Sequence, residues 1–280
     1  MRAADSSAGD WRASSHPGAR IGIIPARLAS TRLPRKLLLA ETGKPLIQHT
    51  YEAAVAAAVF DLVVIATDSD EIASVARGFG ARTLMTSPDC ATGTDRVHEA
   101  ADALDLDDGA IVVNVQGDEP QLTPGILTGL VEALSSELAM RDGGGDFQVA
   151  THAFAITREE ADDPDLVKVV VAADGRALYF SRSRIPCLRD EATGDSVAAE
   201  SPWLGHAGIY AFAAEALRRF SRLPPSALER LERLEQLRLL EAGIPVKVVV
   251  GEKPGIGIDT RADYDVFVRG ERPGDRKREQ

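Results

Sequence analysis

From Ile21 onward, short apolar runs alternate with longer stretches in which apolar residues recur at helical spacing. Short apolar runs are typical of buried strands, and the longer stretches are typical of amphipathic helices. When the two kinds of segment alternate along a chain, the pattern predicts a parallel sheet covered by helices. We therefore expect an α/β fold in which a mostly parallel sheet carries helices on both faces.

The expected elements follow from this pattern and from capping signals. Strands are expected at residues 20–26, 61–67, 82–85, 110–115, 205–214 and 246–250. Helices are expected at residues 46–59, 69–79, 123–140, 226–243 and 261–270, and a glycine-containing loop enters a further helix within residues 87–104. Residues 166–181 break the alternation, because two apolar runs flank Asp174-Gly175 and predict a β-hairpin insertion.

Composition suggests one folded domain with two terminal extensions. The chain has 280 residues, of which 44% are hydrophobic, enough to fill a large core. Residues 1–19 are rich in small residues and residues 271–280 are rich in charge, so we expect both to be disordered. A single domain is then expected over residues 20–270, with the hairpin beginning a smaller region, at about residues 147–215, that serves an acceptor or a dimer contact.

The overall charge excludes some classes of partner. The formal net charge is −11 and the isoelectric point is near 5.0, which opposes general binding to nucleic acid or to an anionic membrane. Cys90 and Cys187 are far apart and suggest neither a disulfide framework nor a zinc site. No run of eighteen apolar residues occurs, and residues 1–19 lack an apolar signal-peptide core. These features predict a cytoplasmic protein.

One loop has the opposite charge. The stretch "IIPARLASTRLPRK", residues 23–36, carries Arg27, Arg32, Arg35 and Lys36 directly after a predicted strand. In an acidic chain, such a local basic loop indicates a small anionic ligand such as a polyphosphate. The loop matches neither G-x-x-x-x-G-K nor G-x-G-x-x-G. From spacing alone, a solvated basic surface remains the alternative.

Acidic residues follow two other predicted strands. The stretch "VVNVQGDEP" places Asp118 after an apolar strand, and "PGIGIDT" places Asp259 near the last helix. Ligands of open α/β sheets bind beyond the carboxyl ends of the strands. Two aspartates there, together with phosphate oxygens, would suit a Mg²⁺ ion. Helix capping is the ordinary role of aspartate before a helix and remains the alternative for both residues.

Seven segments that occur in the same order, from about Ile21 to Val268, resemble the 3-deoxy-manno-octulosonate cytidylyltransferases, or CMP-Kdo synthetases. They are "IIPARLASTRLPRKLL", "TGTDRV", "VVNVQGDEP", "ALYFSRSRIP", "GHAGIYAF", "LERLEQLRLL" and "GIDTRADYD". The resemblance implies a Rossmann-like nucleotide-diphospho-sugar transferase fold and a homodimer. It also implies a Mg²⁺-dependent reaction of CTP with Kdo that yields CMP-Kdo and pyrophosphate by in-line attack of the sugar-acid anomeric hydroxyl on the α-phosphate.

The resemblance assigns roles to particular residues. The implied nucleotide-binding residues are Arg27, Arg32, Lys36, Gly93, Thr94 and Arg96. The implied acceptor-binding residues are Gln116, Arg182, His206, Tyr210, Glu235 and Gln236. Asp118 and Asp259 are the implied metal ligands, and with Arg27 and Lys36 they form the implied catalytic set. Without the resemblance, His206 would be interpreted as a structural histidine and Glu235 as part of a solvated helix face.

Two departures from the family pattern keep alternatives open. Arg35 stands where the family usually has glycine, and we expect it to add a charge beside the phosphates. Cys90, Ala91 and Thr92 differ from the family in the nucleotide loop, where Cys90 is expected to be a small buried side chain. The alternatives are a cytidylyltransferase for another acid, such as amino-Kdo, a small phosphonate or a keto acid, and a nucleotide-binding protein without catalysis. A uridylyl or guanylyl transferase is disfavoured because the opening loop is not of the G-x-G-T-R type.

Overall fold

The computed structural model describes residues 16, 18–30, 32–140, 145–189 and 201–270. Most of the expected leader and the whole expected tail lie outside the described residues. The strands have the following bounds: β1 (Arg20–Ala26), β2 (Leu62–Thr67), β3 (Arg82–Met85), β4 (Ile111–Asn114), β5 (Val149–Ala155), β6 (Lys168–Val171), β7 (Ala177–Ser181), β8 (Leu204–Ala213) and β9 (Val246–Gly251).

Within the described residues these strands form one sheet in the order β3-β2-β1-β4-β8-β5-β9, with β6 beside β8 and β7 beside β6. Strands β1 to β4 are parallel, and β5 and β9 run in the same direction, whereas β8 lies antiparallel between β4 and β5. The predicted mostly parallel sheet is confirmed. Strands β6 and β7 form the predicted hairpin, whose turn contains Gly175 at φ +85°.

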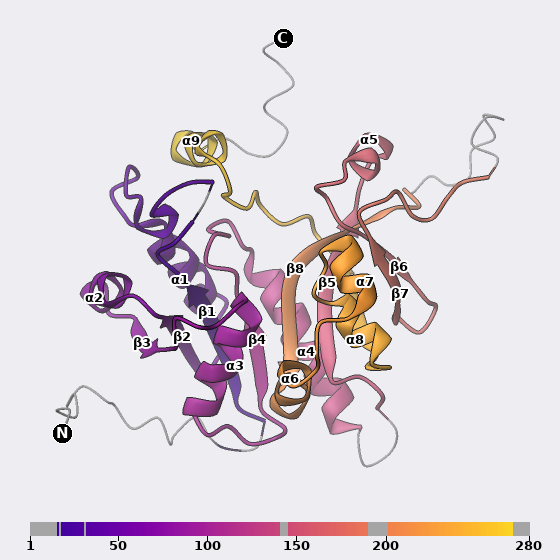
Figure 1. Cartoon of the computed structure of the whole chain (residues 1–280), viewed down its shortest axis with the longest axis horizontal. Coiled ribbons are helices and arrows are strands. Elements are labelled where there is room, and N and C mark those ends of the chain that lie inside the picture. The colour runs from indigo at the N-terminus through magenta and orange to yellow at the C-terminus, as the bar shows by residue number, and fades with distance from the viewer. Residues whose placement is uncertain (1–15, 17, 31, 141–144, 190–200, 271–280) are drawn as a thin grey trace, which may run out of the picture.

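The helices have these bounds: α1 (Leu46–Ala56), α2 (Asp70–Gly78), α3 (Gly93–Ala103), α4 (Pro124–Ala139), α5 (Arg158–Asp162), α6 (Ala214–Ser221), α7 (Ala227–Glu232), α8 (Leu237–Glu241) and α9 (Arg261–Arg269). The short 3-10 helix η2 (Lys36–Leu38) lies in the basic loop. Figure 1 shows α1 and α2 with β1 to β3 at one end of the molecule, and α5, α7 and α8 with β6 and β7 at the other.

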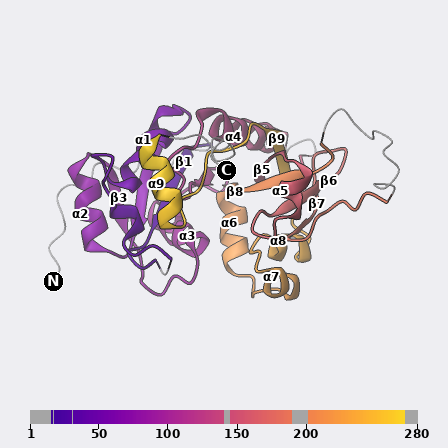
Figure 2. The same ribbon diagram turned by 90° about the horizontal axis from the view of Figure 1, so that it is seen from above.

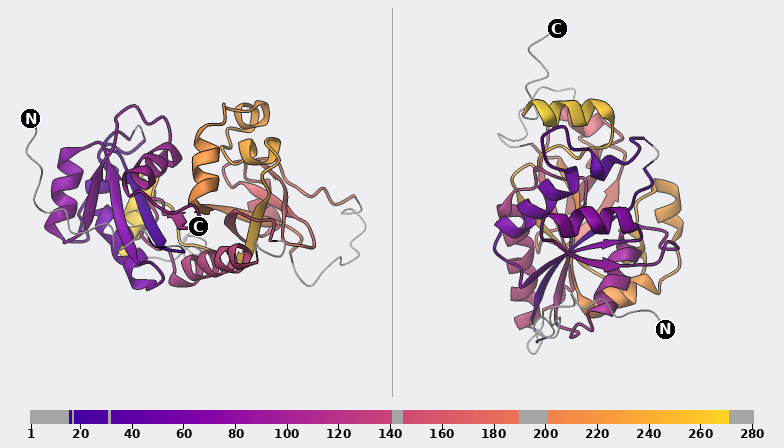
Figure 3. Two further views of the ribbon diagram at one scale, coloured as in Figure 1. Left: turned by 90° about the horizontal axis from the view of Figure 1, so that it is seen from below. Right: turned by 90° about the vertical axis from the view of Figure 1, so that its left-hand side faces the viewer.

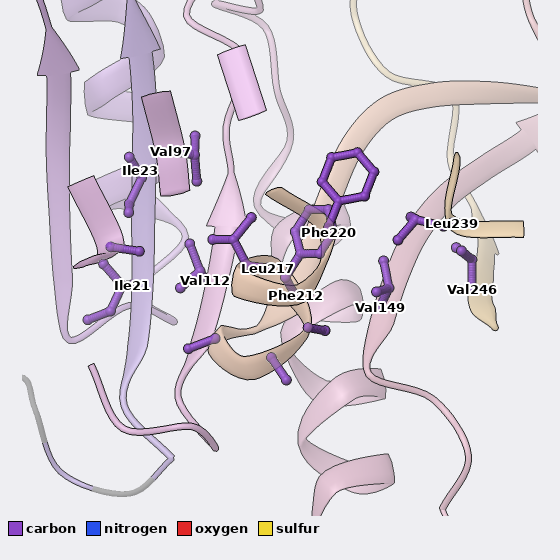
Figure 4. Close-up of a cluster of buried hydrophobic side chains, with 14 of the residues drawn as sticks. Ile21, Ile23, Val97, Val112, Val149, Phe212, Leu217, Phe220, Leu239 and Val246 are labelled. Carbon is purple, nitrogen blue, oxygen red and sulfur yellow. The ribbon is translucent and has the colours of Figure 1, made fainter. Parts of the chain in front are cut away.

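Hydrophobic clusters cover both faces of the sheet, as predicted. Along β2, Val64 belongs to one buried cluster, and its neighbours Val63 and Ile65 belong to the other, because side chains alternate across a strand. Helices α3, α6 and α8 pack on the first cluster, part of which is drawn in Figure 4 with Val97 and Leu217 pointing toward the sheet. Helices α1, α2 and α4 pack on the second cluster, so the two groups of helices lie on opposite faces (Figure 3).

Several elements differ from the sequence prediction. The single helix expected at residues 226–243 is wrong, because Arg233 adopts φ 54° and separates α7 from α8. A non-glycine residue rarely adopts this conformation, so the helical pattern of leucines gave no sign of the break. Strand β5 and helices α5 and α6 were not predicted.

The segment after β9 brings distant parts of the chain together. Figure 2 shows β9 beside β5 at one end of the molecule and α9 beside α1 at the other, so residues 252–260 cross the carboxyl edge of the sheet. The backbone N–H of Ile258 donates to the carbonyl of Asp118 over 2.9 Å and holds this crossing segment against the end of β4. None of the helices in the described ranges is long and apolar enough to span a lipid bilayer.

Candidate active site

Two adjoining cavities lie at the carboxyl ends of the strands. The first cavity, about 290 Å³, lies between the loop after β1, the start of α3 and the end of β4. The second cavity, about 890 Å³, lies between β8, α5, the segment joining α7 to α8 and the segment after β9. Gln116 and Asp259 line both cavities, so the two spaces meet at these side chains.

Residues from three distant segments converge where the cavities meet. The ammonium of Lys36 lies 2.6 Å from Oδ2 of Asp118 and 3.1 Å from Oδ1 of Asp259. Arg32 adds an ion pair of 3.0 Å to Oδ2 of Asp259. Gly117 permits this packing, because a Cβ there would lie 3.0 Å from the carbonyl oxygen of Pro25. The basic loop is therefore not simply a solvated surface, since Lys36 is buried against two aspartates.

The capping alternative for these aspartates is wrong. Helix α4 has Thr123 at its N-cap position, and α9 is capped by Thr260, which forms a reciprocal capping box with Asp263. Asp118 and Asp259 are thus left to face the cavities.

The carboxylates of Asp118 and Asp259 have the chemistry of ligands for a divalent cation. Beside them, burial raises the pKa of Glu119 to about 8, and the charges of Asp118 and Asp259 add to this shift. Oε2 of Glu119 has no hydrogen-bond partner among the described residues. The hard carboxylate oxygens of Asp118 and Asp259 are suitable ligands for Mg²⁺. In the described part of the chain, no three His, Cys, Asp or Glu side chains form a metal site, so two aspartates would need ligands from a substrate.

Arg96 is a buried cation in the wall of the first cavity. Its side chain is 4% exposed, Nη2 lies 3.0 Å from Oδ2 of Asp68, and Nη1 donates to the hydroxyl of Thr86. It projects from the first turn of α3, which starts at Gly93 and is capped by Thr92. Amide groups at a helix N-terminus favour an anion. The first cavity therefore combines a helix N-terminus with the predicted Arg27, Arg32, Lys36 and Arg96.

The expectation that Arg35 adds a charge beside the phosphates is wrong. Its backbone is left-handed, at φ 57° and ψ 26°, a conformation that favours glycine. Its guanidinium forms an ion pair with Glu71 of α2 and does not line the first cavity. Arg35 therefore adds no charge to the cavity wall.

Cys90 lines the first cavity as a half-buried thiol. Its Sγ donates to Oε2 of Glu99 over 3.1 Å, and burial, followed by this carboxylate, raises the pKa of Cys90 to about 11. Since the thiolate is the reactive form, a nucleophilic role is disfavoured.

Glu235 and Gln236 reach the second cavity because the chain is not helical between α7 and α8. Oε2 of Glu235 accepts a 2.7 Å hydrogen bond from the hydroxyl of Thr94. Burial raises the pKa of Glu235, and its Oε1 has no hydrogen-bond partner within the described ranges. Thr94, predicted to bind the nucleotide, lines the second cavity and not the first.

Strand β8 supplies His206 and Tyr210 to the second cavity. Nε2 of His206 lies 2.9 Å from the hydroxyl of Thr151, and burial lowers the pKa of His206 to about 3. His206 is thus neutral at physiological pH and holds a structural contact while it lines the cavity. Burial raises the pKa of Tyr210, whose hydroxyl has no hydrogen-bond partner among the residues that the structure describes.

Among the predicted site residues that the structure describes, Arg182 is the one that lines neither cavity. Its Nε donates to the carbonyl of Glu232 over 2.9 Å and its Nη1 to that of Pro164 over 3.0 Å. Conversely, Glu119 and Lys253 line the second cavity and were not predicted. Glu119 lies within the quoted stretch "VVNVQGDEP" and Lys253 directly precedes "PGIGIDT", but nothing in the local pattern distinguishes either from a solvated charge.

Comparisons with known proteins agree with this arrangement. A family model described as cytidylyltransferase matches residues 21–250. The chain is 48% identical to the 3-deoxy-manno-octulosonate cytidylyltransferase of Nitratidesulfovibrio vulgaris strain Hildenborough, over 91% of this chain and 96% of that protein. It is 46% identical to the enzyme of the same name from Acidobacterium capsulatum, over 87% and 92% of the respective chains.

Solved structures extend the similarity to three dimensions. The structure of a CMP:2-keto-3-deoxy-manno-octonic acid synthetase complexed with CTP is 40% identical and superposes with a TM-score of 0.80, over 90% of this chain and 98% of that chain. A 4-diphosphocytidyl-2C-methyl-D-erythritol synthase from Anaerococcus prevotii, at 16% identity and a TM-score of 0.55, shares the fold. On its sequence, its α/β fold and its matching relatives, the chain belongs to the 3-deoxy-manno-octulosonate cytidylyltransferase family.

Proposed function

We propose that this protein transfers the cytidylyl group of CTP to 3-deoxy-D-manno-octulosonate (Kdo) and releases pyrophosphate. The observation that carries the proposal is the convergence of Lys36, Asp118 and Asp259 at the meeting point of the two cavities. A phosphate held in the first cavity and a hydroxyl held in the second would approach each other there. The named activity of relatives at 44–48% identity supports this choice of substrates.

The proposed reaction is one displacement at phosphorus. The anomeric hydroxyl of the acid forms a bond to the α-phosphorus, the bond from that phosphorus to the pyrophosphate oxygen breaks, and the hydroxyl proton is lost to solvent. The protein contributes mainly positioning and electrostatic stabilisation. Arg27, Arg32 and Lys36 are placed to bind the triphosphate and to stabilise the charge that builds on pyrophosphate. No covalent intermediate with the protein is needed.

We propose Asp118 and Asp259 as the residues that hold Mg²⁺. Their carboxylates already bind cationic groups, because both contact the ammonium of Lys36 and Asp259 also pairs with Arg32. A bound Mg²⁺ would neutralise charge on the phosphate oxygens. Lys36 lines the first cavity and would bind a phosphate oxygen of the nucleotide there.

A homodimer and a location in the cytoplasm, where CTP is available, belong to the same proposal. Gln116, His206, Tyr210, Glu235 and Gln236 are proposed to bind the acceptor, because all five line the second cavity. Arg182 could bind the acceptor only if its guanidinium exchanged its hydrogen bonds to backbone carbonyls for hydrogen bonds to the acceptor.

Pyrophosphate release by the purified protein tests the proposal. Each of the four nucleoside triphosphates is supplied with Mg²⁺, with and without Kdo. We expect release only when CTP and Kdo are both present. Release from CTP with another acid would change the acceptor. CTP binding without release in the presence of any acid would instead favour the non-catalytic alternative.

A further inference from the structure

The second cavity contains a lysine to which no role has been assigned. Its lining includes the carboxylates of Glu119, Glu160, Asp163, Asp165, Glu235 and Asp259. Among the lining residues that the structure describes, Lys253 is the one lysine or arginine. Its ammonium is therefore the one lysine or arginine charge in a described wall that contains six carboxylates.

Contacts on two sides hold Lys253 in place. Its ammonium pairs with Oε1 of Glu160 and lies 5.8 Å from the centre of the Phe154 ring. Oε2 of the same Glu160 accepts from the backbone N–H of Thr157 over 2.9 Å, in the capping box that starts α5. Because the capping box orients the carboxylate, the carboxylate in turn orients the ammonium.

The backbone before Lys253 is held as well. The carbonyl of Glu252 accepts from Nε2 of His152 over 2.7 Å, and the carboxylate of Glu252 accepts from the hydroxyl of Thr123. An ammonium has three N–H donors, of which Glu160 occupies one. The ion pair favours one position of the ammonium before a ligand binds, which lowers the entropic cost of a further hydrogen bond, and the 45% exposure of the Lys253 side chain leaves it accessible to a ligand.

The place of Lys253 in the cavity indicates which part of an acceptor it can contact. The reacting hydroxyl must lie where the cavities meet, at Gln116 and Asp259. Lys253 and Glu160 line the second cavity but not the first. An acceptor with its reacting end at Asp259 would extend into the second cavity, where its other end could contact Lys253.

We propose that Lys253 is a binding residue for the acceptor and donates hydrogen bonds to the hydroxyl groups remote from the reacting centre. In Kdo these are the hydroxyls on the two terminal carbons, which lie outside the six-membered ring at the end opposite the carboxyl group. The inference rests on the proposed function, because it takes the acceptor to be a polyhydroxylated acid. On this proposal, Lys253 helps to select the length of the acceptor and has no part in nucleotide binding.

The test combines three variants with two ligands. The values of kcat and KM with Kdo as the varied substrate are measured for wild type, Lys253→Met, Lys253→Arg and Glu160→Gln. Inhibition of the same proteins is measured with 2-keto-3-deoxygluconate, an acid that lacks the two terminal carbons of Kdo. Lys44→Met serves as a matched control, because Lys44 also pairs with a glutamate, Glu52, and lines neither cavity.

We expect Lys253→Met to raise KM for Kdo about tenfold, with kcat and KM for CTP within about twofold of wild type, as for the loss of one charged hydrogen bond. The inhibition constant of the shorter acid should change less than about twofold, because it lacks the hydroxyls that Lys253 binds. Lys253→Arg should restore KM for Kdo to within about threefold, because arginine keeps the donors. Glu160→Gln should raise KM less than Lys253→Met, since the ammonium remains.

Two results would overturn the inference while the proposed function stands. One is that the wild-type enzyme turns over Kdo and the Lys253→Met variant has the same KM for Kdo as wild type. The other is an equal loss of affinity for both acids in Lys253→Met and Glu160→Gln, which would mean that the pair only ties α5 to the segment after β9. A wild-type protein that releases no pyrophosphate from CTP and Kdo would instead contradict the proposed function itself.

Discussion

The hydroxyl of Thr94 donates a 2.7 Å hydrogen bond to Oε2 of Glu235 and so joins the first turn of α3 to the segment between α7 and α8. The helix whose N-terminus faces the first cavity is thereby tied to a carboxylate that lines the second. Because the second oxygen of Glu235, Oε1, has no hydrogen-bond partner in the described ranges, the Thr94 bond to Oε2 is important for placing this buried group.

Thr94→Val should therefore weaken acceptor binding. The variant keeps the shape of the side chain but removes the donor, and an unsatisfied buried carboxylate costs about 1–3 kcal/mol. We expect KM for Kdo to rise about tenfold, with a smaller change in KM for CTP. Thr42→Val is the matched control, because the hydroxyl of Thr42 is exposed and bonds to the carbonyl of Lys44. Equal KM values for Kdo in wild type and Thr94→Val would refute the role of this bond.

Asp118→Asn and Asp259→Asn should nearly abolish turnover while the protein stays folded. Each change removes one of the two charges proposed to hold Mg²⁺, so we expect pyrophosphate release to fall at least about 100-fold at any Mg²⁺ concentration. Circular dichroism verifies folding, and Asp265→Asn on α9 is a control, because its carboxylate pairs with Arg261 outside both cavities. Release at the wild-type rate in either variant would rule out the metal assignment.

Asp68→Asn should affect stability and nucleotide binding together. Asp68 pairs with Arg96, which is 4% exposed, and removal of one partner from a buried pair leaves the other charge uncompensated. Because Asp68 is partly exposed and Thr86 still accepts from Arg96, we expect a loss of about 2 kcal/mol in the free energy of unfolding, and a higher KM for CTP. Urea unfolding and steady-state kinetics measure the two effects.

Asp102→Asn provides the comparison for Asp68→Asn, since Asp102 lies on the same helix as Arg96 and its exposed carboxylate does not contact Arg96 but lies near His98. This control should leave both the free energy of unfolding and the KM for CTP unchanged. An Asp68→Asn protein as stable as the control would show that Arg96 does not need its carboxylate partner.

His206 should make stability fall on acidification. Burial lowers its pKa to about 3, whereas a histidine in the unfolded chain titrates near 6.5. Below about pH 6.5 the unfolded chain binds a proton that the folded protein does not, so the stabilisation present above this pH is lost progressively toward pH 3. At pH 5 the loss amounts to about 2 kcal/mol.

The variant His206→Gln lacks this titration. From pH 7 to pH 5 its free energy of unfolding should decrease by about 2 kcal/mol less than that of wild type. Urea denaturation at the two pH values tests this difference, and the other titrating groups are common to both proteins. Parallel curves for the two proteins would mean that His206 is protonated in the folded state.

Most of the sheet and its covering helices could be predicted, because apolar periodicity reports directly which residues a strand or helix buries. The break at Arg233 could not, since the leucines on both sides keep helical spacing and the left-handed backbone depends on the surroundings. This break matters for the site, because it turns Glu235 and Gln236 toward the second cavity.

By itself, the sequence determined the α/β class, the basic loop and the placement of Asp118 and Asp259 at strand and helix boundaries, because these depend on local pattern and chain order. Only the tertiary structure decided that Lys36 lies between the two aspartates, that Arg35 turns to Glu71 and that Lys253 enters the second cavity. Such contacts join residues far apart in the chain, and their energies depend on burial and distance, which no local pattern encodes.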